Sequence, residues 1–297
     1  MHDLILATSF GYSYEQLRPF LASLKETGFD GEIVLFIGNT SRDTQHRLRR
    51  DGVKLVPFFY PFKRAHKMRN PLYRVWPLAH RFLRGIEKPG TLAALSAPFH
   101  NISTLRYLLY YRFLRSRPGQ YRFIFLTDLR DVFFQRNPFD HAERGGLRFY
   151  VEEPPHTVGA CPNNSRWIRE FFGEDVLLSL ANEPIICSGT TLGDSAAIHT
   201  YLEKFILTFR QARSIMRVGA DQGIHNYLAR TELASAVTLC PNREHEVLTM
   251  GLMPRDEEFP RNERGQLIAR NGAAYAVVHQ FDRHEALNRE ILERYRI

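Results

Sequence analysis

The chain has 297 residues and a formal net charge of +8, so it is long enough to bury a full core in one large α/β domain or two small ones. No run of about 18 apolar residues occurs, and the stretch after Met1 lacks the basic start and long apolar core of a signal peptide. We therefore expect an unexported, cytoplasmic protein. The chain has three cysteines and no C-x-x-C pair, which argues against a disulfide framework and against a structural zinc site.

The positive charge is concentrated between Arg42 and Lys88, where thirteen Lys or Arg residues face three acidic ones, a net charge of +10. Four prolines, Pro57, Pro61, Pro71 and Pro77, interrupt the part of this segment after residue 56 and predict loops with one short helix there. Such a segment suits an anionic membrane surface, a lipid-linked phosphate or an acidic glycan. We expect peripheral contact with the inner membrane face through residues 42–88, although a solvated basic face explains the charge equally well.

The first sixty residues predict a β-α-β-α-β unit. Apolar runs predict strands over 3–11, 32–37 and 53–56, and amphipathic spacing predicts helices over 14–25 and 43–50. This order is typical of a Rossmann-like nucleotide-binding half. Because neither G-x-G-x-x-G nor G-x-x-x-x-G-K-[ST] is present, the chain is not expected to bind a dinucleotide or to contain a P-loop.

The most informative stretch combines a buried strand with an acidic turn. The apolar run 123–126 predicts a strand covered on both faces, and Asp128 and Asp131 lie where that strand leaves the core. Ligands of open α/β sheets collect beyond the carboxyl ends of the strands, and carboxylates bind hard divalent cations. The alternative is that Asp128 caps a turn while Arg130 and Asp131 form a surface ion pair.

Two acidic or small-residue stretches follow. The strand predicted over 147–151 ends in Glu152 and Glu153, which are a general base, contacts to a ligand or solvated acids. Residues 185–193 predict a small-residue turn between apolar runs, and Gly189 in it permits a close backbone approach. A scaffold helix is expected from Ser195 to about residue 213.

The last two stretches carry an acid-amide pair and a histidine. Asp221 and Gln222 lie at the start of a predicted helix. Asp221 could be the N-cap of this helix, with or without a role in a site. The apolar run 274–278 predicts a strand that ends at His279, which is either a ligand or a packed side chain.

Taken in order, these motifs resemble the GT-A-fold, metal-dependent nucleotide-sugar glycosyltransferases. The acidic turn and the apolar run ending in Asn137-Pro138-Phe139 are similar to the Asp-x-Asp region of that family, with one more residue between the acids. We align Asp131 with the second acid. Asp221-Gln222 followed by Asn226 resembles the Asp-Gln-x-x-x-Asn signature of its retaining, family-eight-like members. The residues after His279 depart from the family, because Phe281-Asp-Arg-His replaces its Gly and Lys-Pro-Trp.

The resemblance implies an α/β fold: a single GT-A-like domain over residues 1–297, with a Rossmann-like N-terminal half and a mixed, mostly parallel central sheet. Residues 1–140 would form the nucleotide-binding half and residues 141–297 the acceptor half. The implied reaction transfers a hexosyl or pentosyl group from a nucleotide diphosphate donor, a UDP-sugar, to a hydroxyl of a glycan or lipid-linked acceptor. The resemblance further implies that the anomeric configuration of the sugar is retained. It implies no nucleic-acid partner.

The resemblance also implies roles for individual residues. A divalent metal, Mn²⁺ or Mg²⁺, would be held by Asp128, Asp131 and His279. Donor contacts would come from Thr8, Ser9, Arg106, Asp128, Ser188 and Gly189, with Arg112 as the alternative to Arg106 and with Lys67 or Arg69 adding phosphate contacts. Asp221 and Gln222 would flank the reacting sugar carbon.

Two competing interpretations remain at this point. In the first, Asp128 is the nucleophile of a haloacid-dehalogenase-type phosphatase, although that family places its acids closer together and near the N-terminus. In the second, the basic segment docks an inert domain onto a polyanion or a membrane, and its binding weakens steeply with salt.

Overall fold

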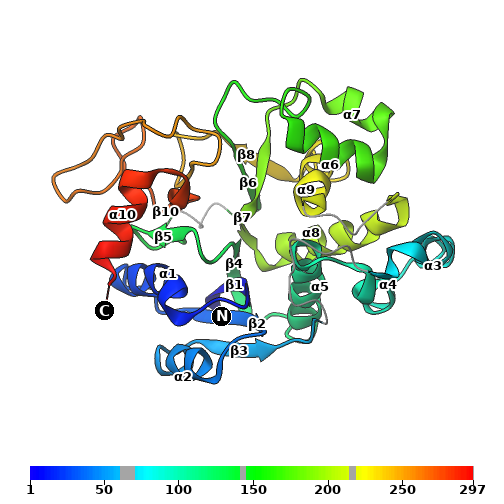
Figure 1. Cartoon of the computed structure of the whole chain (residues 1–297), viewed down its shortest axis with the longest axis horizontal. Coiled ribbons are helices and arrows are strands. Elements are labelled where there is room, and N and C mark those ends of the chain that lie inside the picture. Colours follow the sequence, from blue (N-terminus) through cyan, green and yellow to red (C-terminus); the bar gives the residue numbers. More distant parts are fainter. Residues whose placement is uncertain (61–70, 141–144, 214–218, 297) are drawn as a thin grey trace.

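A seven-stranded sheet runs through the centre of the molecule (Figure 1). The computed structural model describes residues 1–60, 71–140, 145–213 and 219–296. The strand order is β3-β2-β1-β4-β7-β6-β8. Only β7 runs antiparallel to the other six. The strands of this sheet are β1 His2–Phe10, β2 Glu32–Gly38, β3 Lys54–Pro57, β4 Tyr121–Thr127, β6 Leu147–Val151, β7 Ile186–Asp194 and β8 Val237–Cys240.

A second, three-stranded sheet has the order β5-β10-β9. Its central strand pairs antiparallel with β5 and parallel with β9, so it connects the residues just after the acidic turn to the C-terminal part of the chain. The strands are β5 Val132–Phe134, β9 Val247–Thr249 and β10 Val277–His279.

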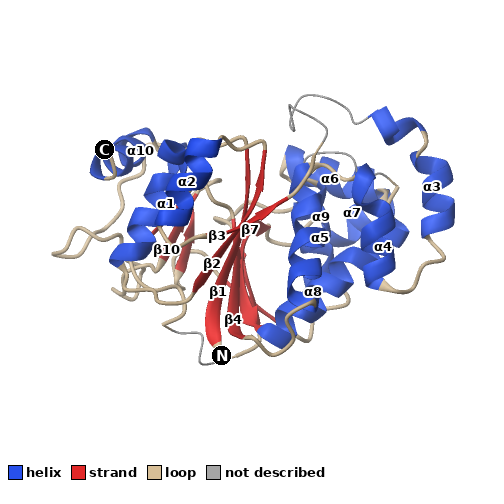
Figure 2. Ribbon diagram, turned by 90° about the horizontal axis from the view of Figure 1, so that it is seen from below, coloured by secondary structure: helices blue, strands red, loops and turns tan. Residues whose placement is uncertain are grey.

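Helices cover both faces of the central sheet. The helices are α1 Tyr14–Glu26, α2 Arg42–Arg50, α3 Trp76–Leu83, α4 Pro89–Ser96, α5 Ile102–Arg115, α6 Pro162–Phe172, α7 Glu174–Leu180, α8 Ser195–Leu207, α9 Ala220–Arg230 and α10 Glu285–Arg294. Figure 2 shows α1 and α2 on one face, and α5, α8 and α9 on the other, with α3 outermost on that side. Within the described ranges, no helix has both the length and the apolar character needed to cross a membrane.

The alternation of side chains along β1 explains why both faces are covered. Leu4 and Leu6 lie in the core beneath α5 and α8, whereas Ile5 and Ala7 lie in the core beneath α1. All four side chains are fully buried. A strand whose successive residues are all apolar can bury both faces only if each face has its own helical layer.

The structure confirms the α/β fold class and the mixed, mostly parallel central sheet expected from the sequence. The first five predicted elements appear in the predicted order as β1, α1, β2, α2 and β3. The helices α6, α7 and α10 and the strands β8 and β9 were not among the predicted elements.

One prediction about local structure was wrong. The turn expected over residues 185–193 is instead β7, a continuous strand whose Thr190 to Asp194 pair with β4. Small residues there permit close packing without breaking the strand. The described part of the basic segment after β3 contains loops, a 3-10 turn over Pro71–Arg74 and the short helix α3, in agreement with the prediction of loops and one short helix. Pro77 lies in the first turn of α3, where proline is tolerated.

The central strand β4 offers a direct test of the core. Phe125 is fully buried, so Phe125→Ala should lower the free energy of unfolding by about 3–5 kcal/mol, measured by urea denaturation. Phe59 is 87% exposed, so the control Phe59→Ala should change it by less than about 0.5 kcal/mol. Equal effects of the two substitutions would contradict the placement of β4.

Candidate functional site

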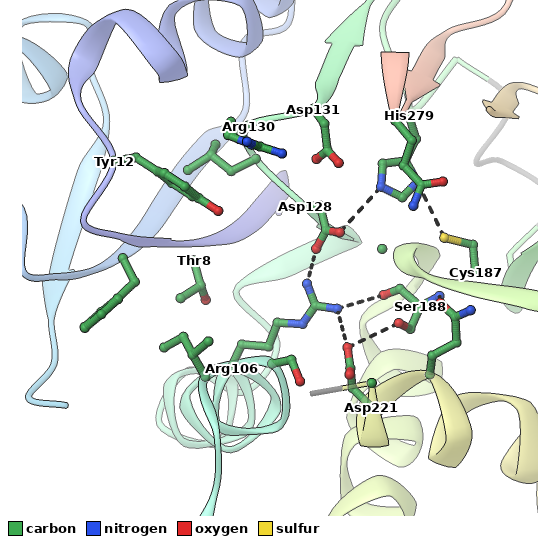
Figure 3. Close-up of a pocket in the computed structure, with 18 of the residues that line it drawn as sticks. Thr8, Tyr12, Arg106, Asp128, Arg130, Asp131, Cys187, Ser188, Asp221 and His279 are labelled. Carbon is green, nitrogen blue, oxygen red and sulfur yellow. Dashed lines mark hydrogen bonds and ion pairs between the residues drawn. The ribbon is translucent and has the colours of Figure 1, made fainter. Parts of the chain in front are cut away.

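A cavity of about 960 Å³ opens beyond the carboxyl ends of β1 and β4. The chain passes from β1 to β2 and β3 on one side and returns to β4 on the other, so the cavity lies at the topological switch point of the sheet. Thr8 from β1 and Asp128 from the end of β4 both line it. Figure 3 shows seven of the predicted site residues around this space: Thr8, Arg106, Asp128, Asp131, Ser188, Asp221 and His279.

Backbone hydrogen bonds bring the acidic turn and the late histidine together. The Asp128 amide donates to the Gly189 carbonyl at 2.7 Å, and the Gln280 amide donates to the Asp131 carbonyl at 2.7 Å. In the small sheet, His279 is paired with Val132, the residue after Asp131. The turn between β4 and β5 is therefore fastened to β7 on one side and to the end of β10 on the other.

The result is a cluster of three possible metal ligands. One donor atom each from Asp128, Asp131 and His279 lies within 4.8 Å of the others. His279 is fully buried, and its Nδ1 contacts the Cys187 sulfur at 3.5 Å. Its Nε2 lies 3.4 Å from Asp128 Oδ2 and has no hydrogen-bond partner within the described part of the chain. Two carboxylates and an imidazole nitrogen suit Mn²⁺ or Mg²⁺.

Gly189 keeps this space open. A methyl group added to it would lie 2.3 Å from His279 Cε1 and 2.8 Å from Asp128 Oδ2. Real Cβ atoms do not approach other atoms so closely, so any larger residue would displace the ligand cluster. The predicted need for glycine is thus explained by the space between two side chains, and not by a turn.

The pKa values of the three side chains in this cluster are shifted in different directions and by different causes. Burial opposes ionisation of Asp128, but Arg106 and His279 outweigh it and hold the pKa of that carboxyl well below its usual range. Burial raises the pKa of Asp131. Burial would lower the pKa of His279, yet Cys187 and Asp128 raise it well above its usual range. The surroundings of His279 Nε2 therefore stabilise a positive charge, which a cation supplies as well as a proton does.

Arg106 lies on the opposite side of Asp128. Its guanidinium pairs with Asp128 Oδ1, and a second nitrogen lies 3.0 Å from Asp221 Oδ2. That nitrogen also donates to the Ser188 carbonyl at 3.2 Å, as the Tyr107 hydroxyl does at 3.0 Å. Arg106 therefore connects the acidic turn to the helix that carries Asp221.

The predicted acid-amide pair lines the same cavity. Asp221 is the second residue of α9, where its side chain pairs with Arg106 and accepts from the Ser188 hydroxyl at 3.3 Å instead of capping the helix. Gln222 donates to Asn164 Oδ1 at 3.0 Å and to Glu152 Oε1 at 3.5 Å. The N-cap interpretation of Asp221 is therefore wrong, since Gly219 occupies the N-cap.

Several alternatives from the sequence lie elsewhere. Ser9 is fully buried and does not line the cavity, because its side chain points away from Thr8 on the strand. Arg112 is exposed on α5 and is not a cavity residue. Arg130 pairs with Asp282 at 2.8 Å, and not with Asp131 as in the alternative interpretation of the acidic turn.

Glu152 and Glu153 do not line the cavity. Glu153 is paired with Arg243 at 2.7 Å and accepts a hydrogen bond from Asn242. Glu152 is buried behind Gln222, and burial raises its pKa. Lys67 and Arg69 lie outside the described residues.

Sequence reasoning missed three residues that shape the site. Cys187 contacts His279 from behind, Asn164 holds the Gln222 amide, and Trp167 lies against Gly219, where an added methyl group would be 2.0 Å from the indole. Only Cys187 had a signal in the sequence, because it directly precedes Ser188-Gly189. Asn164 and Trp167 lie on α6, which has no motif of its own.

Comparisons with known proteins add little to this geometry. No protein-family model matches the chain, and no curated protein matches it. Among solved structures, core-mannan synthase A (CmsA/Ktr4) from Aspergillus fumigatus, in an Mn/GDP form, is similar with a TM-score of 0.43 and 12% sequence identity. The match covers 80% of this chain and 72% of that one. A likeness of this size does not assign an activity.

The space beside Gly189 is directly testable. Gly189→Ala should weaken Mn²⁺ binding at least about tenfold, because displaced ligands and altered outer contacts cost roughly 10–100-fold in metal affinity. Isothermal titration with MnCl₂ measures the change, and thermal unfolding reports whether the fold survives. Gly223→Ala is the matched control, since its added methyl group would make only ordinary contacts at 3.6 Å. Equal affinity of Gly189→Ala and the wild type would disprove this role of the glycine.

Proposed function

We propose that this protein is a metal-dependent glycosyltransferase that moves a sugar from a nucleotide diphosphate to a hydroxyl acceptor. The observation that carries the proposal is the convergence of Asp128, Asp131 and His279 on one wall of a cavity that Asp221 and Gln222 also line. The resemblance found in the sequence predicts these same five residues. A cavity of about 960 Å³ has the size typical of sites for small molecules and cofactors.

Asp128, Asp131 and His279 would hold the divalent ion. The buried Nε2 of His279, which makes no hydrogen bond within the described ranges and faces Asp128 Oδ2, and the space beside Gly189 both fit such an ion. When bound, Mn²⁺ or Mg²⁺ supplies Lewis-acid stabilisation of the negative charge on a departing diphosphate.

Arg106 would position the donor. Because it pairs with Asp128 and Asp221 together, it holds the ion-binding acid at a set distance from the proposed catalytic acid. The hydroxyl of Thr8 bonds to Tyr110 at 3.0 Å on the other side of the cavity and would contact the nucleotide.

Asp221 and Gln222 would flank the sugar carbon that becomes cationic. A carboxylate beside that carbon stabilises positive charge, and the Gln222 side chain is held in place by Asn164. The Asp-Gln resemblance favours retention, which needs no separate base. Inversion needs a carboxylate that reaches the acceptor, and of Glu152, Glu153 and Asp221 only Asp221 lines the cavity.

The donor nucleotide and the acceptor rest on the resemblance alone. It favours a UDP-sugar carrying a hexosyl or pentosyl group, and a glycan or lipid-linked hydroxyl. The basic segment 42–88 is compatible with an anionic acceptor, although residues 61–70 of it lie outside the described part of the chain.

The phosphatase interpretation has less support. A nucleophilic aspartate needs one oxygen that faces the phosphorus, but Arg106 engages Asp128 Oδ1, and Oδ2 faces His279 and the space proposed for the metal. Release of phosphate from simple phosphoesters without turnover of any nucleotide-sugar would nevertheless favour it over sugar transfer.

A panel of nucleotide-sugars tests the proposal directly. We expect Mn²⁺-dependent hydrolysis and thermal stabilisation with one donor, seen by chromatography of the released nucleotide and by differential scanning fluorimetry. NMR of the transferred sugar would report retention or inversion. No response to any donor with or without Mn²⁺ would overturn the proposal.

Asp131→Ala tests the metal ligands. We expect the rate of donor turnover to fall at least roughly 10³-fold, because Lewis-acid stabilisation is worth several kcal/mol and each 1.4 kcal/mol is a factor of ten. Asp131→Asn should also be impaired, since an amide lacks the negative charge. Asp175→Ala on α7 removes an exposed acid and should keep full activity. An Asp131→Ala protein with wild-type turnover would remove the metal-site hypothesis.

A further inference from the structure

The helix α3 presents an apolar ridge to solvent. Val75, Leu78 and Phe82 are 46%, 76% and 70% exposed. Their spacing of three and four residues places them on one side of the helix. The other side is buried through Trp76 and Leu83. Both views of the fold place α3 at the outer edge of the molecule (Figures 1 and 2).

Basic side chains flank this ridge. Arg81, Arg84 and Lys88 are exposed, and none of the three makes an ion pair within residues 1–60, 71–140, 145–213 and 219–296. The sequence from Arg74 to Lys88 contains four basic residues and one acid, Glu87. A helix at the surface of a globular protein normally turns its apolar side inward, whereas α3 has apolar side chains on both sides.

We propose that α3 docks the protein onto an anionic lipid surface. Exposed Leu and Phe side chains enter the boundary between headgroups and acyl chains, and neighbouring arginines bind anionic headgroups. Charge complementarity selects this partner. A second copy of the chain would bring a second set of the same basic residues into the contact, and like charge disfavours that contact. A nucleic acid would use the arginines but leave Leu78 and Phe82 in water.

The docking does not depend on the reaction proposed above, because none of these residues lines the cavity. It places the protein beside acceptors that reside in a membrane. The exposed apolar ridge of α3 could not be predicted from the positive charge of the segment, because it depends on which apolar side chains the fold leaves exposed.

Co-sedimentation with vesicles tests the apolar ridge. The wild type should bind vesicles of phosphatidylglycerol and phosphatidylcholine, and bind poorly to phosphatidylcholine alone. L78E/F82E should weaken binding at least roughly tenfold, because two apolar side chains no longer enter the bilayer. L178E is the matched control, since Leu178 on α7 is 66% exposed, and it should bind like the wild type.

A second pair of variants tests the charges. R81Q/R84Q should weaken binding roughly 20- to 30-fold, because each arginine near an anionic surface contributes about a factor of five. R49Q/R50Q removes two exposed arginines from α2, on the opposite face of the sheet, and should have little effect. Donor hydrolysis should be unchanged in all of these variants, so a failure of docking is distinguishable from a failure of the proposed reaction.

Three results would overturn the docking proposal. The first is that L78E/F82E binds vesicles as tightly as the wild type, or that L178E loses as much vesicle binding as L78E/F82E does. The second is a dimer in size-exclusion chromatography with light scattering that L78E/F82E dissociates, since the ridge would then be a contact between copies. The third is a large fall in the unfolding temperature of L78E/F82E, which would show that other parts of the chain cover these side chains.

Discussion

The buried guanidinium of Arg106 holds the wall of the cavity together. It pairs with Asp128 at the end of β4 and with Asp221 at the start of α9, and it donates to the Ser188 carbonyl of β7. An uncompensated charge in such a place is strongly destabilising, so each partner requires the others. Four elements, including α5, which carries Arg106, are thereby fixed around one space.

The two carboxylate oxygens of Asp128 face different groups. One oxygen pairs with the Arg106 guanidinium, and the other faces His279 and the space beside Gly189 that is proposed for the metal. The arginine keeps the carboxylate ionised, and this is the state in which it can bind a metal. The backbone bonds of the acidic turn to β7 and to the residue after β10 make the same arrangement rigid.

The architecture separates the cavity from the proposed docking helix. The cavity lies at the carboxyl ends of β1 and β4, where the chain reverses its direction along the sheet. The helix α3 lies outside α4 and α5, at the edge of the helical layer (Figure 2). A protein built in this way can contact a surface through one part while its cavity stays accessible to a soluble donor.

The sequence by itself determined the alternation of strands and helices in the first sixty residues, the buried strand before Asp128, and the candidacy of Asp131 and His279. These features are local, because the apolar periodicity and the residue types at the ends of strands depend only on neighbouring residues. Only the tertiary structure decided that residues 186–194 form a strand, that Cys187 supports His279, and that Leu78 is left in solvent. Strand pairing and burial depend on partners far away along the chain, and no local pattern encodes them.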